Sequence, residues 1–264
     1  MKIRIISAFL LATLMLPAAA QRVDRPDTIN DHPNLNGVWQ SLNTAYWNVE
    51  AHSAEALDEF WKLGAMAAIP AGKSVVRGGK IPYLPAALEQ RASNQANWPA
   101  ADPEAKCFML GIPRATYHNM PFQIVQGDGD MLMVYPFAAA NRTIHMNDPS
   151  MPPLDSYMGK SSGSWEGDVL VVVTTGQNEE TWLDRAGNHH SNQLKVTERF
   201  TLLNAWHIWY EATLEDPQTY SEAWTLEMPL YRLVESNAQI LEHKCVPFAD
   251  KLLYSDLLGL DEEN

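Results

Sequence analysis

From Phe122 onward, apolar and polar residues alternate in short runs, and this alternation constrains the fold more than any other feature of the chain. Side chains of a β-strand point alternately to opposite faces, so a period of two is typical of strands with one buried face. Turn residues separate the runs, as at Gly127-Asp128-Gly129-Asp130 and Gly167-Asp168. Strands do not alternate with long helical segments, so a doubly wound parallel sheet is not expected.

The pattern predicts a mainly β fold in one domain. Expected strands run through residues 36–40, 122–126, 131–137, 141–147, 164–166, 169–175, 194–201, 206–214, 223–233 and 239–244. Roughly eight to ten short strands joined by tight turns are typical of an antiparallel barrel or a sandwich.

The rest of the chain predicts a few helices and one long loop segment. Apolar residues at helical spacing predict helices at about 54–68 and 86–95, and a closing helix at 248–258. Residues 69–120 are rich in proline and glycine, which predicts a loop segment. The segment is long for a connection, so it is a candidate lid or mouth of a site.

The first twenty residues have the pattern of a cleaved export signal. Lys2 and Arg4 precede an apolar run that ends before Ala18-Ala19-Ala20, a typical cleavage site. The run is shorter than the roughly 20 residues that cross a bilayer. We expect a periplasmic or secreted protein that is not inserted in a membrane once the signal is removed. Residues 21–34 are expected to form a flexible lead-in to a single domain at 35–264.

Charge and cysteine content narrow the partners and the chemistry. The formal net charge of −13 argues against nucleic acid or an anionic membrane surface as a partner. Cys107 and Cys245 are the only cysteines, and an oxidising compartment favours a disulfide between them; two separate buried thiols are the alternative.

The densest polar cluster is the segment Trp182 to Ser191, in a loop between two apolar runs. A histidine beside a carboxylate suits proton transfer near neutral pH, because the carboxylate orients the ring and raises its basicity. We therefore predict His190 as general base or acid and Asp184 as the residue that orients it. The alternative is a polar turn held by local hydrogen bonds to the backbone.

Two charged residues lie where apolar side chains are expected. Glu198 shares a strand face with Val196 and Phe200, and Arg142 is flanked by apolar residues in another strand. A buried charge needs a partner, so the two residues either position the polar end of a substrate or form a structural salt bridge. We include both among the predicted catalytic residues.

Further candidates would bind a substrate rather than react with it: Trp182, Tyr210, Tyr117 and His118, with core packing as the alternative for each. The counts of nine Trp and eleven Met are high, and these side chains suit the walls of an apolar pocket as well as a core. The remaining histidines are scattered, and nucleotide-binding and serine-hydrolase motifs are lacking, so neither a metal nor a cofactor is expected.

Two resemblances accompany these patterns. Gly37-Val38-Trp39 and Gly163-Ser164-Trp165 are similar to the G-x-W segment that opens lipocalins, which implies an antiparallel, lipocalin-like barrel. Longer motifs cover most of the mature chain: residues 33–39, 78–83, 107–114, 165–172, 181–191, 196–200 and 210–217. With these the chain resembles a large group of exported bacterial proteins, most of them uncharacterised. The resemblance implies a shared fold and a shared pocket, although Pro247 stands where the group's pattern has an acidic residue.

These observations together favour an exported barrel enzyme that acts on a hydrophobic, aromatic small molecule by cofactor-independent acid–base chemistry, as a lyase or isomerase does. A non-catalytic carrier of the same ligands is the main alternative, and a structural envelope protein is another. An enzyme requires acid–base residues that face a cavity, whereas a carrier requires a cavity lined almost wholly by apolar groups.

Overall fold

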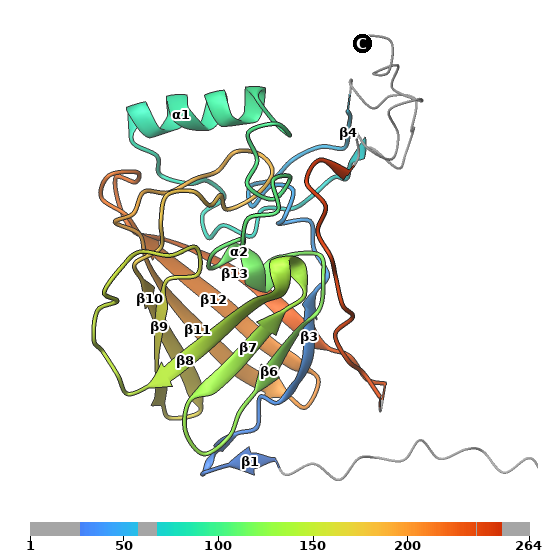
Figure 1. Cartoon of the computed structure of the whole chain (residues 1–264), viewed down its shortest axis with the longest axis vertical. Helices are drawn as coiled ribbons and strands as arrows, with labels where there is room; N and C mark the ends of the chain where they lie inside the picture. The colour runs from blue at the N-terminus through green and yellow to red at the C-terminus, as the bar shows by residue number, and fades with distance from the viewer. Residues whose placement is uncertain (1–26, 58–67, 236, 250–264) are drawn as a thin grey trace, which may run out of the picture.

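The structure is a computed structural model that describes residues 27–57, 68–235 and 237–249. Within these residues the chain forms a closed barrel, with helices and long loops gathered at one end (Figure 1). Its strands are β3 (Gly37–Ser41), β6 (Phe122–Val125), β7 (Met131–Tyr135), β8 (Ala140–Met146), β9 (Lys160–Glu166), β10 (Val169–Thr175), β11 (Lys195–Asn204), β12 (His207–Glu215) and β13 (Trp224–Arg232). The predicted mainly β barrel is confirmed.

The barrel is mixed rather than purely antiparallel, which corrects the expectation from sequence. Around the barrel the strand order is β10-β11-β12-β13-β3-β6-β7-β8-β9, and β9 also pairs with β10. β8 and β9 run parallel, with Ile144 opposite Ser161. Parallel neighbours cannot be joined by a tight turn, and the connection from Asn147 to Gly159 provides the longer return.

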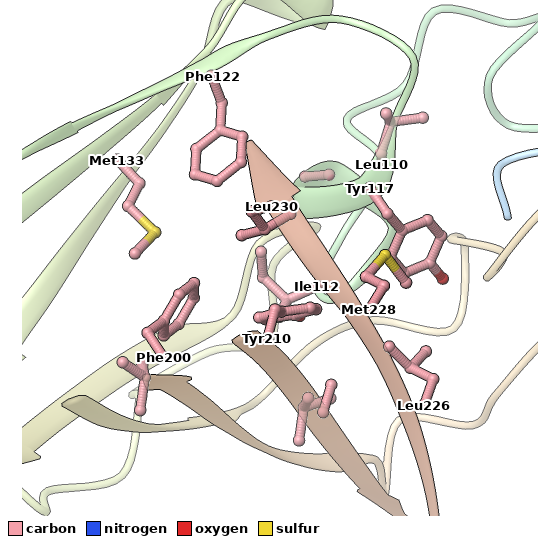
Figure 2. Packing of buried hydrophobic residues seen from close by; sticks show 14 of the residues in the cluster. Leu110, Ile112, Tyr117, Phe122, Met133, Phe200, Tyr210, Leu226, Met228 and Leu230 are labelled. Atoms are coloured by element: carbon pink, nitrogen blue, oxygen red, sulfur yellow. The ribbon is translucent and has the colours of Figure 1, made fainter. Parts of the chain in front are cut away.

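The alternating pattern fills the barrel with side chains from every wall. Leu170, Phe200, Tyr210 and Met228 lie opposite one another on four successive strands, and all are buried. Figure 2 shows Phe200, Tyr210 and Met228 with further residues of this cluster. The barrel centre is therefore a packed core.

The expected helix at 86–95 is confirmed by α1 (Pro85–Ala96). At the expected helix 54–68, the described ends instead form strands: β4 (Glu55–Ala56) pairs with β5 (Ala68–Ile69), and residues 58–67 lie outside the described residues. In the lead-in, β1 (Thr28–Ile29) pairs with β2 (His32–Pro33). The export signal and most of the closing helix also fall outside the described residues. Among the residues described, no helix is long and apolar enough to cross a membrane.

The C-terminal segment forms a strap, residues 237–249, rather than the strand predicted at 239–244. The barrel leaves it no edge to join, because β3 already pairs with β13 on one side and β6 on the other. Instead the chain runs from β13 past β3 to the looped end, where the Phe248 amide donates to the Ala105 carbonyl (Figure 1).

A disulfide between Cys107 and Cys245 joins this strap to the loop segment before α2 (Arg114–Tyr117). The bridge confirms the predicted pairing and excludes two separate thiols. It links positions 138 residues apart, so it greatly restricts the unfolded chain.

We expect the Cys107→Ser/Cys245→Ser double variant to lose about 2–5 kcal/mol of unfolding free energy, because its unfolded chain gains the entropy of a long open loop. Urea unfolding of the oxidised protein and the variant measures the difference. Adding reductant to the double variant is the control and should change nothing. Equal unfolding midpoints for the two proteins would contradict the expectation.

Candidate functional site

The predicted pairing of Asp184 with His190 does not occur. Asp184 is fully buried and accepts hydrogen bonds from the backbone amides of Val49, Ala186 and Asn188, and from the Asn188 side chain. Burial raises the pKa of Asp184 to about 6, against the effect of these donors. Its four hydrogen bonds connect the 184–188 turn to the backbone at Val49, so Asp184 stabilises the contact between these two loop segments.

His190 is held between two other groups. Its Nδ1 lies 2.9 Å from the Ser191 carbonyl oxygen, which can only accept, so Nδ1 carries the proton. Nε2 then accepts from the Thr181 hydroxyl at 2.7 Å. Burial lowers the pKa of His190, which keeps the ring neutral. Both nitrogens are satisfied within the fold, so the structure does not support His190 as the proton-transfer residue. Trp182, in the same loop, is buried and bridges to His189 through the backbone.

Arg142 and Glu198 form a salt bridge in the interior of the barrel, one of the two outcomes expected from sequence. The Tyr210 hydroxyl donates to Glu198 at 2.9 Å, and Arg142 donates to Ser161 and Thr174 at 2.7 and 2.8 Å. All five side chains are buried, and burial raises the pKa of Tyr210 well above its ordinary value. This arrangement supports a structural role for Arg142, Glu198 and Tyr210.

Replacing Arg142 by methionine should destabilise the protein by about 3–5 kcal/mol, because Glu198 is left as an unpaired buried charge. Urea unfolding at neutral pH measures the loss. The matched control is Arg199→Met, which breaks the exposed Arg199–Glu166 pair at 2.8 Å and should cost at most about 1 kcal/mol. Similar losses in the two variants would contradict the burial argument.

A cavity opens at the looped end of the barrel, close to α2. Its walls combine apolar side chains with one imidazole and one phenol: Leu110, Ala115, His118, Met120, Tyr135, Pro136, Phe137 and Ala140. The cavity is small, with room for about one water molecule. Of the residues predicted from sequence, only His118 lines it. Tyr117, the preceding residue, donates its hydroxyl to the Leu183 carbonyl at 2.7 Å and anchors α2 (Figure 2 shows its ring).

A carboxylate holds His118 in place from one side. His118 Nε2 lies 3.3 Å from Glu104 Oε1, and Glu104 pairs in turn with Arg114 and Arg185. Burial opposes the ionisation of Glu104, but the two guanidinium groups outweigh it and hold its pKa well below the ordinary value. Asp102 pairs with Arg114 at 3.2 Å and completes the cluster, which we call the Glu104 cluster: Asp102, Glu104, Arg114, His118 and Arg185.

The other nitrogen of His118 has no partner among the described residues. An ionised Glu104 can only accept, so Nε2 of His118 carries the proton and donates it. Burial lowers the pKa of His118 below its ordinary 6.5, although Glu104 opposes the shift, so the ring is neutral at pH 7. Nδ1 then has a free lone pair, and it is buried without a hydrogen bond. A carboxylate-oriented imidazole with a free nitrogen is the arrangement of a general base.

Arg185 also connects the Glu104 cluster to aromatic rings of the loop before β4. Its guanidinium carbon lies 4.4 Å from the Trp47 ring centroid and 5.2 Å from that of Tyr46. Tyr46 in turn contacts the His118 ring edge-on, with centroids 6.3 Å apart. These contacts fix the guanidinium plane, and with it the carboxylate that orients His118.

Most of this site was missed by the motif analysis. Glu104 and Tyr135 belong to none of the motifs, and Arg114 and Arg185 lie in the motifs 107–114 and 181–191 but were given no role. Glu104, Arg114 and His118 do lie within the proline- and glycine-rich segment 69–120 that was predicted to form a mouth or lid. The composition of that segment was the available signal for the site.

Comparisons with known proteins do not assign the chain to a family. No protein-family model matches the chain, and no curated protein matches it either.

Proposed function

We propose that the protein is an exported enzyme that acts on a hydrophobic, aromatic small molecule by cofactor-independent acid–base chemistry of the lyase or isomerase type. One observation carries the proposal: His118, oriented by Glu104, lines an apolar cavity and keeps an unpaired nitrogen. In this proposal His118 removes a proton from the substrate, and Glu104 stabilises the imidazolium that forms. His118 therefore takes the role that the sequence pattern gave to His190.

The electrostatics of the Glu104 cluster support this role. Two carboxylates, Asp102 and Glu104, face two guanidinium groups, Arg114 and Arg185, so the cluster is balanced while His118 is neutral. The imidazolium formed by proton uptake would be stabilised directly by Glu104 and opposed by the more distant guanidinium groups. A base with a lowered pKa releases its proton readily to complete a turnover.

A carrier function is the second candidate, because six of the eight lining residues are apolar. We also propose that the barrel is lipocalin-like and that the chain belongs to the group of exported proteins that it resembles. Trp39 of the G-x-W segment supports the first point: it is fully buried, donates to the Leu35 carbonyl and lies 4.3 Å under the Arg232 guanidinium.

Incubation of the purified mature protein with a panel of aromatic compounds tests the catalytic role. We expect turnover of at least one compound, and a loss of about 10²–10⁴-fold in kcat/KM in His118→Gln, which removes the base. His145→Ala is the control, because His145 is an exposed surface residue paired with Asp130. Circular dichroism checks that each variant is folded. Saturable binding without turnover would favour the carrier, and full activity in His118→Gln would exclude His118 as the base.

The pH dependence of that turnover is a separate prediction. The pKa of His118 is lowered from 6.5, so the imidazole is neutral at pH 7 and above, and kcat/KM should not change with pH there. It should fall only below pH 6.5, as the imidazole becomes protonated. The protonation of His118 can be followed by NMR in the same buffers, and the two midpoints should agree. A loss of activity that begins above pH 7 would contradict this assignment.

A further inference from the structure

The strap is attached at the looped end of the barrel to the turn that carries Glu104 (Figure 1). Cys245 of the strap is bonded to Cys107, and the Phe248 amide donates to the Ala105 carbonyl at 2.9 Å. The Cys107 amide in turn donates to the Glu104 carbonyl at 3.0 Å. The bridge therefore joins the strap directly to one side of the candidate site.

A second contact of the strap lies on the wall of the cavity. His243 stacks on Phe137 with ring centroids 5.6 Å apart and planes inclined by 22°. Phe137 lines the cavity and also contacts the His118 ring, at a centroid distance of 5.1 Å. Aromatic rings at such distances attract each other. The strap thus supports the wall at Phe137 without lining the cavity itself.

Strained backbone occurs where the strap is attached. Cys107 and Phe248 have φ angles of 64° and 52°, and Ala138 and Ala139, directly after Phe137, have 53° and 48°. Left-handed conformations are unfavourable for residues other than glycine and persist only where surrounding contacts hold them. Both loops therefore have a reason to rearrange when the strap is released.

The cavity is too small for an aromatic ring unless a wall moves, because it has room for about one water molecule. Tyr135 and Ala140 belong to β7 and β8, whose backbones are paired in the barrel. Phe137 lies in the short connection between these two strands and is supported by the strap. Phe137 is therefore the part of the wall that can move while the barrel stays intact.

The bridge is open to thiol–disulfide exchange with a dithiol reductant. Both cysteines are half-buried and lie outside the barrel strands, and Lys244 and Val246 beside Cys245 are exposed. One thiolate of the reductant attacks Cys245 Sγ, and Cys107 leaves as a thiolate that takes up a proton. The second thiolate of the reductant then releases Cys245 as a thiol. Two electrons and two protons pass to the cysteines, and the reductant leaves as a disulfide.

We propose that the Cys107–Cys245 bridge is a redox-sensitive lock on this cavity. The oxidised strap holds Phe137 in the closed wall, and reduction by a dithiol releases the strap and opens the cavity beside His118. The proposal rests on the proposed function for the use of this cavity as the substrate site, and it adds the regulation of that site. Once His243 no longer supports Phe137, the wall can move and make room for an aromatic ring.

Chemical modification of His118 tests the lock in the full mature protein. Diethyl pyrocarbonate acylates accessible neutral imidazoles, and mass spectrometry gives the rate at each histidine. The oxidised protein is compared with protein that has been reduced with dithiothreitol and alkylated with iodoacetamide. We expect His118 to react about tenfold faster after reduction, because the rate follows the population of the open form. An unchanged rate at His118 would overturn the lock.

Two other histidines are internal controls for this measurement. His145 is exposed and should react at the same rate in both samples. His190 is buried with both ring nitrogens bonded and should stay protected in both. Faster reaction of both His118 and His190 would overturn the lock, because the bridge would then support the whole fold rather than one wall of the cavity.

Variants of the strap separate the bridge from the ring. The Cys107→Ser/Cys245→Ser double variant should show fast modification of His118 without reductant. His243→Ala keeps the bridge but removes the ring that supports the wall, so His118 should react faster than in the oxidised parent. Leu241→Ala is the matched control, because Leu241 is 75% exposed on the same strap, and it should match the parent. Slow modification in the double variant, or equal rates in His243→Ala and Leu241→Ala, would overturn the lock.

Failure of this inference is distinguishable from failure of the proposed function, because modification is measured without turnover. Faster modification of His118 after reduction, with no turnover of any compound, would support the lock and favour a carrier. Turnover that depends on His118 but is equal in the oxidised and reduced proteins would support the enzyme and overturn the lock.

Discussion

The parallel pairing of β8 with β9 closes the barrel, and the position of everything outside the barrel depends on that closure. Closure leaves no free edge, so the chain after β13 cannot extend the sheet. It runs along β3 to the looped end instead, where Cys245 is bonded to Cys107 and His243 reaches Phe137. Side chains fill the interior of the closed barrel, and the cavity lies at the mouth of the barrel rather than at its centre.

Two buried charge networks distinguish structure from candidate function. In the interior, Arg142 and Glu198 are matched with each other and with hydroxyl groups. At the mouth, the carboxylates pair with guanidinium groups, but Nδ1 of His118 and Nε of Arg114 have no hydrogen-bond partner among the described residues. A buried polar atom without a partner costs stability, so its persistence beside a cavity points to a ligand or a water molecule. This difference is why the mouth, and not the centre, is the candidate site.

Sequence reasoning failed where it had to choose the partner of a histidine. Asp184 and His190 are close in the chain, and proximity favoured their pairing. In the fold, Asp184 accepts a hydrogen bond from the backbone amide of Val49, which is distant in the chain, and His190 accepts one from the Thr181 hydroxyl. The carboxylate that orients a histidine comes instead from Glu104, which precedes His118 by a loop and the helix α2. Local spacing does not determine such contacts, because they are made by loops whose path depends on the packed barrel beneath them.

The sequence by itself determined the strands of the barrel wall, because the period of two follows directly from the geometry of an extended backbone, but it also predicted a strand at 239–244 that the strap does not form. It also indicated that Glu198 needs a partner and favoured a bridge between Cys107 and Cys245, since burial cost and cysteine chemistry act wherever the residues lie; the structure decided both pairings. Tertiary structure alone decided that β8 and β9 run parallel and that His118 is the histidine beside the cavity. Both depend on contacts between segments far apart in the chain, and those contacts form only when the barrel closes.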